Sequence, residues 1–222
     1  MLAVAAAAIV VIVGLGLVAY LTPLMSVRST DVVANRAVPT DQIVAAAQVP
    51  AGTPLLQVDT REVATRVAAI PSVESARVQR SYPSSLTITV TERVPVAVVR
   101  DGDKVHVLDR SGVGYLTFDR AQGIPPEVAK LPELVTPNPN PSDPTTRASM
   151  AAVAGLPEPI ARELIRVSAS SPVDIEFRLK GNKTVVWGDA DRGDEKARTL
   201  TTLLGRDATV FNVSSPEFPA YR

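Results

Sequence analysis

The sequence lacks several residue types on which common chemistries depend. It has no cysteine, which excludes a disulfide framework and a cysteine-ligated metal. Its single histidine, His106, excludes a site built from several histidines. Aromatic residues make up 4%, too few for a base-stacking platform. Basic and acidic side chains balance at 23 each, so no overall positive charge directs the chain to nucleic acid.

The remaining candidates for catalysis or metal binding are weak. His106 lies between Val105 and Val107 in a strand-like run, which is typical of an exposed strand residue, and a Ser/His/Asp triad would depend wholly on it. The acidic run "GDADRGDE" lacks the alternate spacing of a calcium loop, and a helix cap by Asp191 or Asp194 explains it better. We therefore expect no enzyme, no metal, no cofactor and no small-molecule substrate.

The first segment is long and apolar. Leu2 to Leu21 carries no charge, and at 1.5 Å per residue such a helix is roughly 30 Å long, the thickness of a bilayer core. Tyr20 lies at its end and Pro23 stops it. A cleaved signal peptide would have a shorter apolar region with a basic start. The segment therefore predicts a membrane anchor over residues 1–23, with the signal peptide as the alternative.

A first small domain is expected over residues 24–94. A β-rich run covers Val27 to Val33, and Thr40 is placed to cap a helix that continues to Val49. Asp59 and Glu62 have capping-box spacing and open a second helix. Two strands follow, from Val73 and from Leu86. The predicted order is β-α-α-β-β.

A second domain is expected over residues 95–222, with mixed α and β structure and a mainly antiparallel sheet. Asp101-Gly102 and Gly181-Asn182 predict hairpin turns. A proline-rich span from Pro125 to Pro144 predicts a surface loop. The expected strands are 96–99, 104–109, 115–118, 166–169, 175–179, 184–187 and 210–213, and the expected helices are 147–154, 159–165 and 194–204.

The order of the first domain resembles that of the POTRA (polypeptide-transport-associated) domain. Three stretches resemble more narrowly the FtsQ/DivIB family of bacterial cell-division proteins: "GTPLLQVDT" (Gly52–Thr60), "VESARVQRSYP" (Val73–Pro83) and "LTITVTERVPVAVV" (Leu86–Val99). Two residues depart mildly from the family pattern. Tyr82 stands where the family often has Trp, and Ala34 stands where it often has Gly. The alanine- and arginine-rich composition indicates a GC-rich genome, such as that of an actinobacterium.

The resemblance explains why a regular strand, Leu86 to Val90, is followed by a charged pair and a proline. In the family, this pattern marks the point where the chain leaves the POTRA domain and enters a second β-rich domain. Glu92, Arg93 and Pro95 then form an interdomain joint with almost no linker, and we expect this joint to restrict the angle between the domains. The expected fold is α+β: a single transmembrane helix, a POTRA-like domain and a mixed C-terminal domain.

The resemblance also implies a function. The chain would be a single-pass divisome scaffold at the division septum, with a cytoplasmic N-terminus and the bulk of the chain outside the membrane. Its partners would be FtsB/DivIC-like and FtsL-like bitopic coiled-coil proteins, and the family's partner surface is the C-terminal edge of the second domain. A partner strand added to an unpaired edge fits this role. The carried-over residues are Val210, Phe211, Asn212, Val213 and Ser214, with Phe218 and Tyr221 as apolar anchors.

Two other functions remain open from the residues. A POTRA-type module for polypeptide transport or assembly would bind extended clients, but residues after Val94 are too few for a membrane barrel or further POTRA repeats. A cell-wall enzyme would need a nucleophile–base pair or a metal cluster, and the sequence offers neither.

Overall fold

The structure is a computed structural model that describes residues 9–11, 14 and 25–222. These residues form two compact units, which divide between Arg93 and Val94. The predicted membrane anchor falls almost entirely outside the described residues. Among the residues that are described, no helix is long and apolar enough to cross a membrane. The predicted restriction of the interdomain angle stays a prediction.

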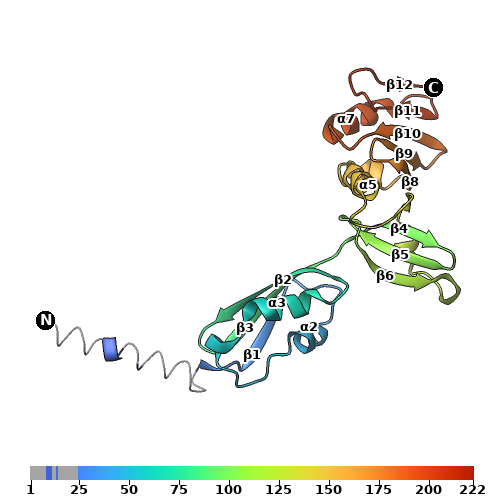
Figure 1. Ribbon diagram of the computed structural model, residues 1–222. Coiled ribbons are helices and arrows are strands. Elements are labelled where there is room, and N and C mark those ends of the chain that lie inside the picture. The colour runs from blue at the N-terminus through green and yellow to red at the C-terminus, as the bar shows by residue number, and fades with distance from the viewer. Residues whose placement is uncertain (1–8, 12–13, 15–24) are drawn as a thin grey trace. The chain divides into compact units, whose positions relative to one another are not determined.

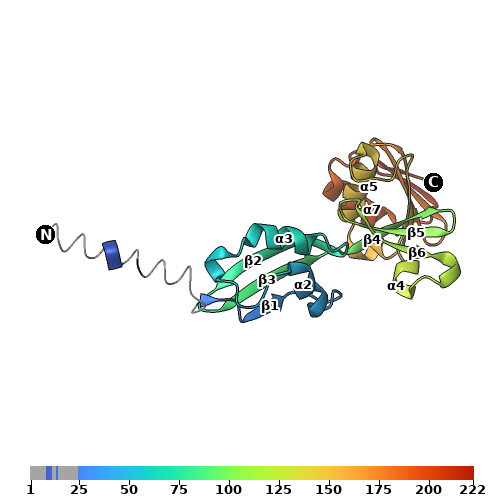
Figure 2. The same ribbon diagram turned by 60° about the horizontal axis from the view of Figure 1, so that its bottom comes forward.

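The first unit has the predicted β-α-α-β-β order. It consists of β1 (Ser29–Val33), α2 (Thr40–Ala47), the 3-10 turn η2 (Leu55–Gln57), α3 (Thr60–Ala68), β2 (Val73–Ser81) and β3 (Ser85–Glu92). The sheet order is β1-β3-β2, with β1 parallel and β2 antiparallel to β3. Both helices lie against this sheet in Figures 1 and 2.

The core of the first unit follows from the alternation of β3. Leu86, Ile88 and Val90 point inward and are at most 2% exposed, because every second residue of a strand faces the same side. They pack with Ile43 of α2 and Val67 of α3, both fully buried. Burial of this cluster holds the two helices on one face of a three-stranded sheet.

Local capping in the first unit is partly as predicted. Asp59 accepts hydrogen bonds from the backbone N–H groups of Arg61 and Glu62, at 2.9 and 3.0 Å, and so opens α3. The prediction that Thr40 caps α2 is wrong. The N-cap residue is Pro39, and the Thr40 hydroxyl instead accepts from the Asn35 side chain at 3.1 Å.

The second unit is a nine-stranded sheet with helices on it. Its elements are β4 (Pro95–Asp101), β5 (Lys104–Asp109), β6 (Gly114–Asp119), η3 (Arg120–Gln122), α4 (Pro126–Ala129), β7 (Glu133–Val135), α5 (Pro144–Ala154), α6 (Glu158–Ala161), β8 (Leu164–Ser171), β9 (Asp174–Leu179), β10 (Lys183–Gly188), α7 (Gly193–Leu203), β11 (Val210–Asn212) and β12 (Ala220–Tyr221). The sheet order is β12-β11-β10-β9-β8-β7-β4-β5-β6. Most neighbours are antiparallel, as predicted; β4/β7, β7/β8 and β10/β11 are parallel.

The two faces of this sheet are covered differently. Helices α5, α6 and α7 pack against the inward residues of β8 to β11 around Phe177 and Trp187, whose ring centroids are 5.1 Å apart. A separate cluster places Val128 of α4 against Val105 and Val107 of β5. Because Leu108 of the same strand belongs to the first cluster, α4 covers the opposite face. Figure 2 shows α4 beside β6.

Three predictions for this unit need correction. The helix expected over residues 159–165 ends at Ala161, and residues 164 and 165 belong to β8. Residues 125–144 are not one surface loop, because they contain α4 and β7, and β7 lies in the middle of the sheet between β4 and β8. The first hairpin forms, but its turn is displaced by one residue from the prediction. Asp101 pairs with Lys104, so the central residues of the turn are Gly102 and Asp103. Of these two residues, only Gly102 has a positive φ. At the second hairpin both Gly181 and Asn182 have positive φ, as expected.

Candidate partner-binding edge of the C-terminal sheet

The sheet of the second unit ends on β12, and this corrects the predicted position of the edge. The segment Val210–Val213 is not the outermost strand. Its ordered part, β11, pairs in parallel with β10 on one side and antiparallel with β12 on the other, where Phe211 faces Tyr221 and Asn212 faces Ala220. The sequence does not predict strand β12, because this strand is only two residues long and follows Pro219.

The predicted edge residues divide into buried and exposed groups. Phe211 and Val213 are fully buried in the core of the second unit, so they support the sheet and do not face a partner. Asn212 is exposed and Val210 is half-buried on the other side of β11. Phe218 and Tyr221 are 85% and 51% exposed, which is high for aromatic side chains. The apolar anchors predicted from the sequence are therefore accessible.

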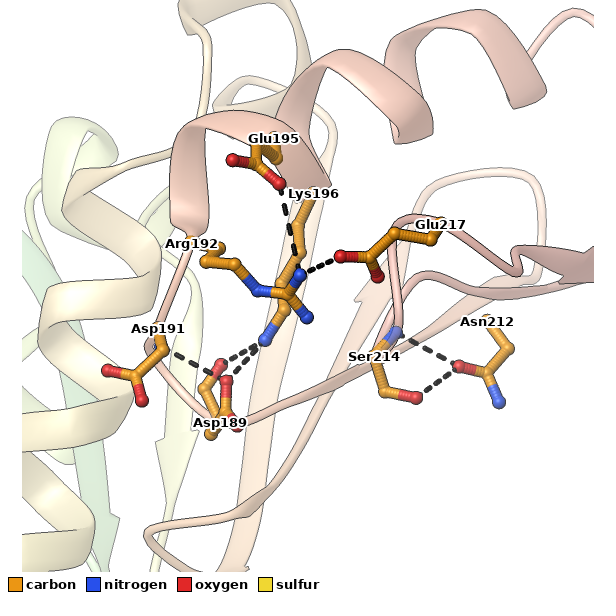
Figure 3. A network of polar contacts seen from close by, with 8 residues as sticks. All are labelled: Asp189, Asp191, Arg192, Glu195, Lys196, Asn212, Ser214 and Glu217. Atoms are coloured by element: carbon orange, nitrogen blue, oxygen red, sulfur yellow. Dashed lines mark hydrogen bonds and ion pairs between the residues drawn. The ribbon is translucent and has the colours of Figure 1, made fainter.

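Two contacts shape the connection between β11 and β12. The Asn212 carboxamide oxygen accepts from the backbone N–H of Ser214 at 3.0 Å and from its hydroxyl at 2.7 Å, which turns the chain after the strand. The Arg192 guanidinium then donates to the Glu217 carboxylate. Figure 3 shows Arg192 reaching from the start of α7 toward this connection.

The start of α7 is held by a buried lysine. Lys196 is fully buried, and its ammonium donates to the Asp189 carboxylate at 2.5 Å and to the Asp189 carbonyl oxygen at 2.9 Å. It also lies 5.9 Å from the ring centroid of Trp187, within cation–π range. The hydrogen bond and charge of Lys196 lower the pKa of Asp189 below its ordinary range, against the raising effect of burial.

This arrangement corrects the predicted helix cap. Neither Asp191 nor Asp194 caps α7; the N-cap residue is Arg192, in a left-handed conformation with no side-chain cap. The acid that holds the start of α7 is Asp189, which binds the Lys196 ammonium, as Figure 3 shows. A signal for this was present in the sequence, because Lys196 lies on the same helix face as Leu200 and Leu203 and so interrupts an apolar stripe.

Gly188 lets the end of β10 approach the chain after β11. Its φ is +80°, and a Cβ at this position would lie 2.9 Å from the Cβ of Ser214. A residue without a side chain is therefore required where β10 ends and the turn after β11 begins.

The other candidate residues lie elsewhere. Glu92 accepts from the backbone N–H groups of residues 36–38, and the Arg93 side chain donates to the Pro71 carbonyl oxygen. Pro95 begins β4. His106 Nδ1 lies 2.9 Å from the Thr117 hydroxyl. Within the described part of the chain, no group of three histidine, aspartate or glutamate side chains is placed to hold a metal ion.

Comparison with known proteins is consistent with this architecture. Residues 25–93 match the model of the POTRA domain, FtsQ-type. The cell division protein FtsQ of Mycolicibacterium smegmatis is 44% identical over 213 residues, which cover 96% of this chain and 62% of the relative. Those of Streptomyces coelicolor and Streptomyces griseus are 33% and 35% identical, over 75% and 88% of their own lengths.

This chain belongs to the FtsQ family of cell-division proteins. The expectation that the chain is not an enzyme agrees with membership of this family. The chain spans about three fifths of the length of the Mycolicibacterium smegmatis FtsQ that it matches.

Proposed function

We propose that this FtsQ-family chain is a membrane-anchored scaffold of the divisome, which assembles at the septum with small bitopic coiled-coil proteins of the FtsB/DivIC and FtsL type. A partner segment adds a strand to the C-terminal sheet at β12. Backbone hydrogen bonds supply the pairing, and Phe218 and Tyr221 supply apolar contacts.

One observation carries this proposal: the nine-stranded sheet ends on a two-residue strand flanked by accessible aromatic side chains. An edge strand has unpaired backbone N–H and C=O groups that can pair with another chain, unless charged residues, proline or a covering segment protect it. Among the residues from Phe218 to Arg222, only Pro219 and the terminal Arg222 are protective types. The edge therefore suits the addition of a partner strand.

The test replaces exposed residues, because Phe211 and Val213 are part of the core and their substitution would unfold the second unit. We combine Phe218→Ser with Tyr221→Pro, which removes both aromatic anchors and one backbone N–H from the edge. The expected result is loss of co-purification with the FtsB-like protein from the same genome, and loss of the septal position of a fluorescent fusion.

The matched control is Val173→Ser, an apolar residue that is 69% exposed in the turn between β8 and β9. It should change neither readout. If the edge variant remains folded and retains both co-purification and septal position, strand addition at β12 is wrong. Binding of unrelated extended polypeptides at the same edge would instead support a POTRA-type transport role.

A further inference from the structure

The second unit contains a basic groove away from the β12 edge. It has a volume of about 1290 Å³ and lies among the start of β8, the segment from α4 to β7, helix α6 and strand β4. The charged side chains that line it are two carboxylates, Glu133 and Glu158, and six cations: Arg100, Arg120, Lys130, Arg162, Arg166 and Lys180. Because the whole chain is formally neutral, this excess of positive charge is local.

One of the two carboxylates, Glu133, orients the side chains of two of these cations. Glu133, whose side chain is 19% exposed, pairs with Arg166 at 2.7 Å and with Arg100 at 3.5 Å. Strands β4, β7 and β8 are neighbours, so the three side chains form a row across the sheet. Since one carboxylate is shared by two guanidinium groups, the row keeps a net positive charge.

The rim of the groove carries further cations. Arg120 and Lys130 are exposed, and within the described residues their side chains make no hydrogen bond or ion pair. Lys180 donates to the Arg162 carbonyl oxygen at 2.8 Å and pairs with Glu163 at 3.5 Å, and the Arg162 guanidinium pairs with Glu158. The positive charges therefore come from several elements around the groove: β4, η3, the residue after α4, the residue after α6, β8 and the residue after β9.

Apolar side chains lie among these cations. Ile165 and Val94 are 49% and 64% exposed, and Leu131 also lines the groove. A ligand that carries only phosphates would leave these apolar side chains in water and would bring its negative charge beside Glu133 and Glu158. A ligand that alternates carboxylates with apolar side chains matches both features.

We propose that this groove binds an acidic amphipathic helix of a partner protein, with its apolar side chains against Ile165 and Leu131 and its carboxylates beside Arg120 and Lys130. Strand addition is not available here, because β4, β7 and β8 each have a neighbour on both sides. Recognition is therefore of the helix-in-groove type. This contact is independent of the β12 edge.

The test uses a fluorescein-labelled helical peptide with leucine at positions i, i+3, i+4 and i+7 and glutamate elsewhere, titrated with the full chain. The groove variant combines Arg120→Glu and Lys130→Glu; Arg100 and Arg166 are left intact because they hold Glu133. The matched control combines Arg198→Glu and Arg206→Glu, which change the charge equally on an exposed surface outside the groove. We expect binding to weaken about tenfold in the groove variant and less than about twofold in the control.

A second variant separates amphipathic recognition from simple charge attraction. Ile165→Ser removes an exposed apolar side chain without changing charge, and we expect it to weaken the same peptide about threefold and to leave polyglutamate binding unchanged. Equal loss in the groove and control variants would overturn the proposal. So would equal binding of polyglutamate, of a lysine–leucine peptide, or of phosphatidylglycerol vesicles. The β12 variant, Phe218→Ser with Tyr221→Pro, should bind the peptide normally, so failure of one interface is distinguished from failure of the other.

Discussion

The loops of the first unit and the β11–β12 connection of the second are held by different polar contacts. In the first unit, charged side chains bind backbone groups: Glu92 accepts from three backbone N–H groups, Arg66 donates to the Ala47 carbonyl oxygen, and Arg80 donates to those of Leu55 and Val58. In the second unit, the β11–β12 connection is held by the neutral Asn212 side chain, which accepts from the Ser214 backbone N–H, and by an ion pair between two exposed side chains, Arg192 and Glu217.

This difference matters for how firmly each region is fixed. A backbone group cannot change rotamer, and a charged side chain bound to buried backbone groups is costly to remove. An exposed ion pair is screened by water and salt and contributes little. We infer that the loops of the first unit are firmly fixed, whereas the β11–β12 connection is held loosely enough to adjust to a partner.

The largest expected effect concerns Lys196, the cation that the second unit buries beneath this connection. Asp189→Ala leaves its ammonium with the backbone carbonyl oxygen of residue 189 and the Trp187 ring. Lys196 is buried, whereas the Asp189 side chain is 45% exposed, so loss of the carboxylate should lower the free energy of unfolding by about 3 kcal/mol, the lower end of the range for a buried charge that loses its partner. Urea unfolding followed by the fluorescence of Trp187, the single tryptophan, reports on this unit. Lys196→Met combined with Asp189→Ala should recover most of the loss; no recovery would mean that the charge is not the cause.

The next effect tests the first unit. Glu92→Ala removes the acceptor of the N–H groups of Arg36, Ala37 and Val38, and Val38 is buried. We expect the free energy of unfolding to fall by about 2 kcal/mol. Hydrogen exchange over residues 25–93 measures this unit separately. Asp31→Ala, an exposed acid on β1, is the control and should leave exchange nearly unchanged; an equal effect would contradict a specific role for Glu92.

Acid should weaken the first unit through the same carboxylate. Burial raises the pKa of Glu92, but hydrogen bonds from the N–H groups of Val38, Ala37 and Arg36 outweigh burial and hold the pKa below its ordinary value of 4.5. The unfolded chain therefore takes up the proton first, and stability is lost as pH falls below about 4.5. Exchange measured from pH 6 to 3 should show this, and Glu92→Gln should flatten the dependence. If the pH dependence of exchange is unchanged in Glu92→Gln, the acid sensitivity comes from other groups, such as Asp59.

Much of the first unit could be predicted from the sequence, because its signals are local. The alternation of Leu86, Ile88 and Val90 and the cap at Asp59 each depend on residues close in the chain. Strand β7 could not be predicted, since its three residues lie among prolines and become a strand only between β4 and β8. The same holds at the edge, where β12 exists only because β11 pairs with it.

A smaller effect is expected at Ala34, where the FtsQ/DivIB family often has glycine. The φ of Ala34 is +68°, a left-handed conformation that glycine adopts without strain. Ala34→Gly should therefore raise the free energy of unfolding of the first unit by about 0.5–1 kcal/mol. Ala37→Gly, in the same loop but without a positive φ, should lower it slightly. The comparison fails if both substitutions change stability in the same direction.

The smallest effect on global stability is expected at Arg192, and it is the sharpest test of the comparison between the units. Arg192→Gln breaks the pair with Glu217 but leaves the fold of the sheet in place, because Phe211 and Val213 remain buried beneath it. The urea midpoint read from Trp187 should not change, whereas amide exchange over residues 214–221 should accelerate. Glu217→Gln should have the same effect, since it removes the other half of the pair. If the midpoint falls as far as in Asp189→Ala, the connection is part of the cooperative core, and the inferred contrast with the first unit is wrong.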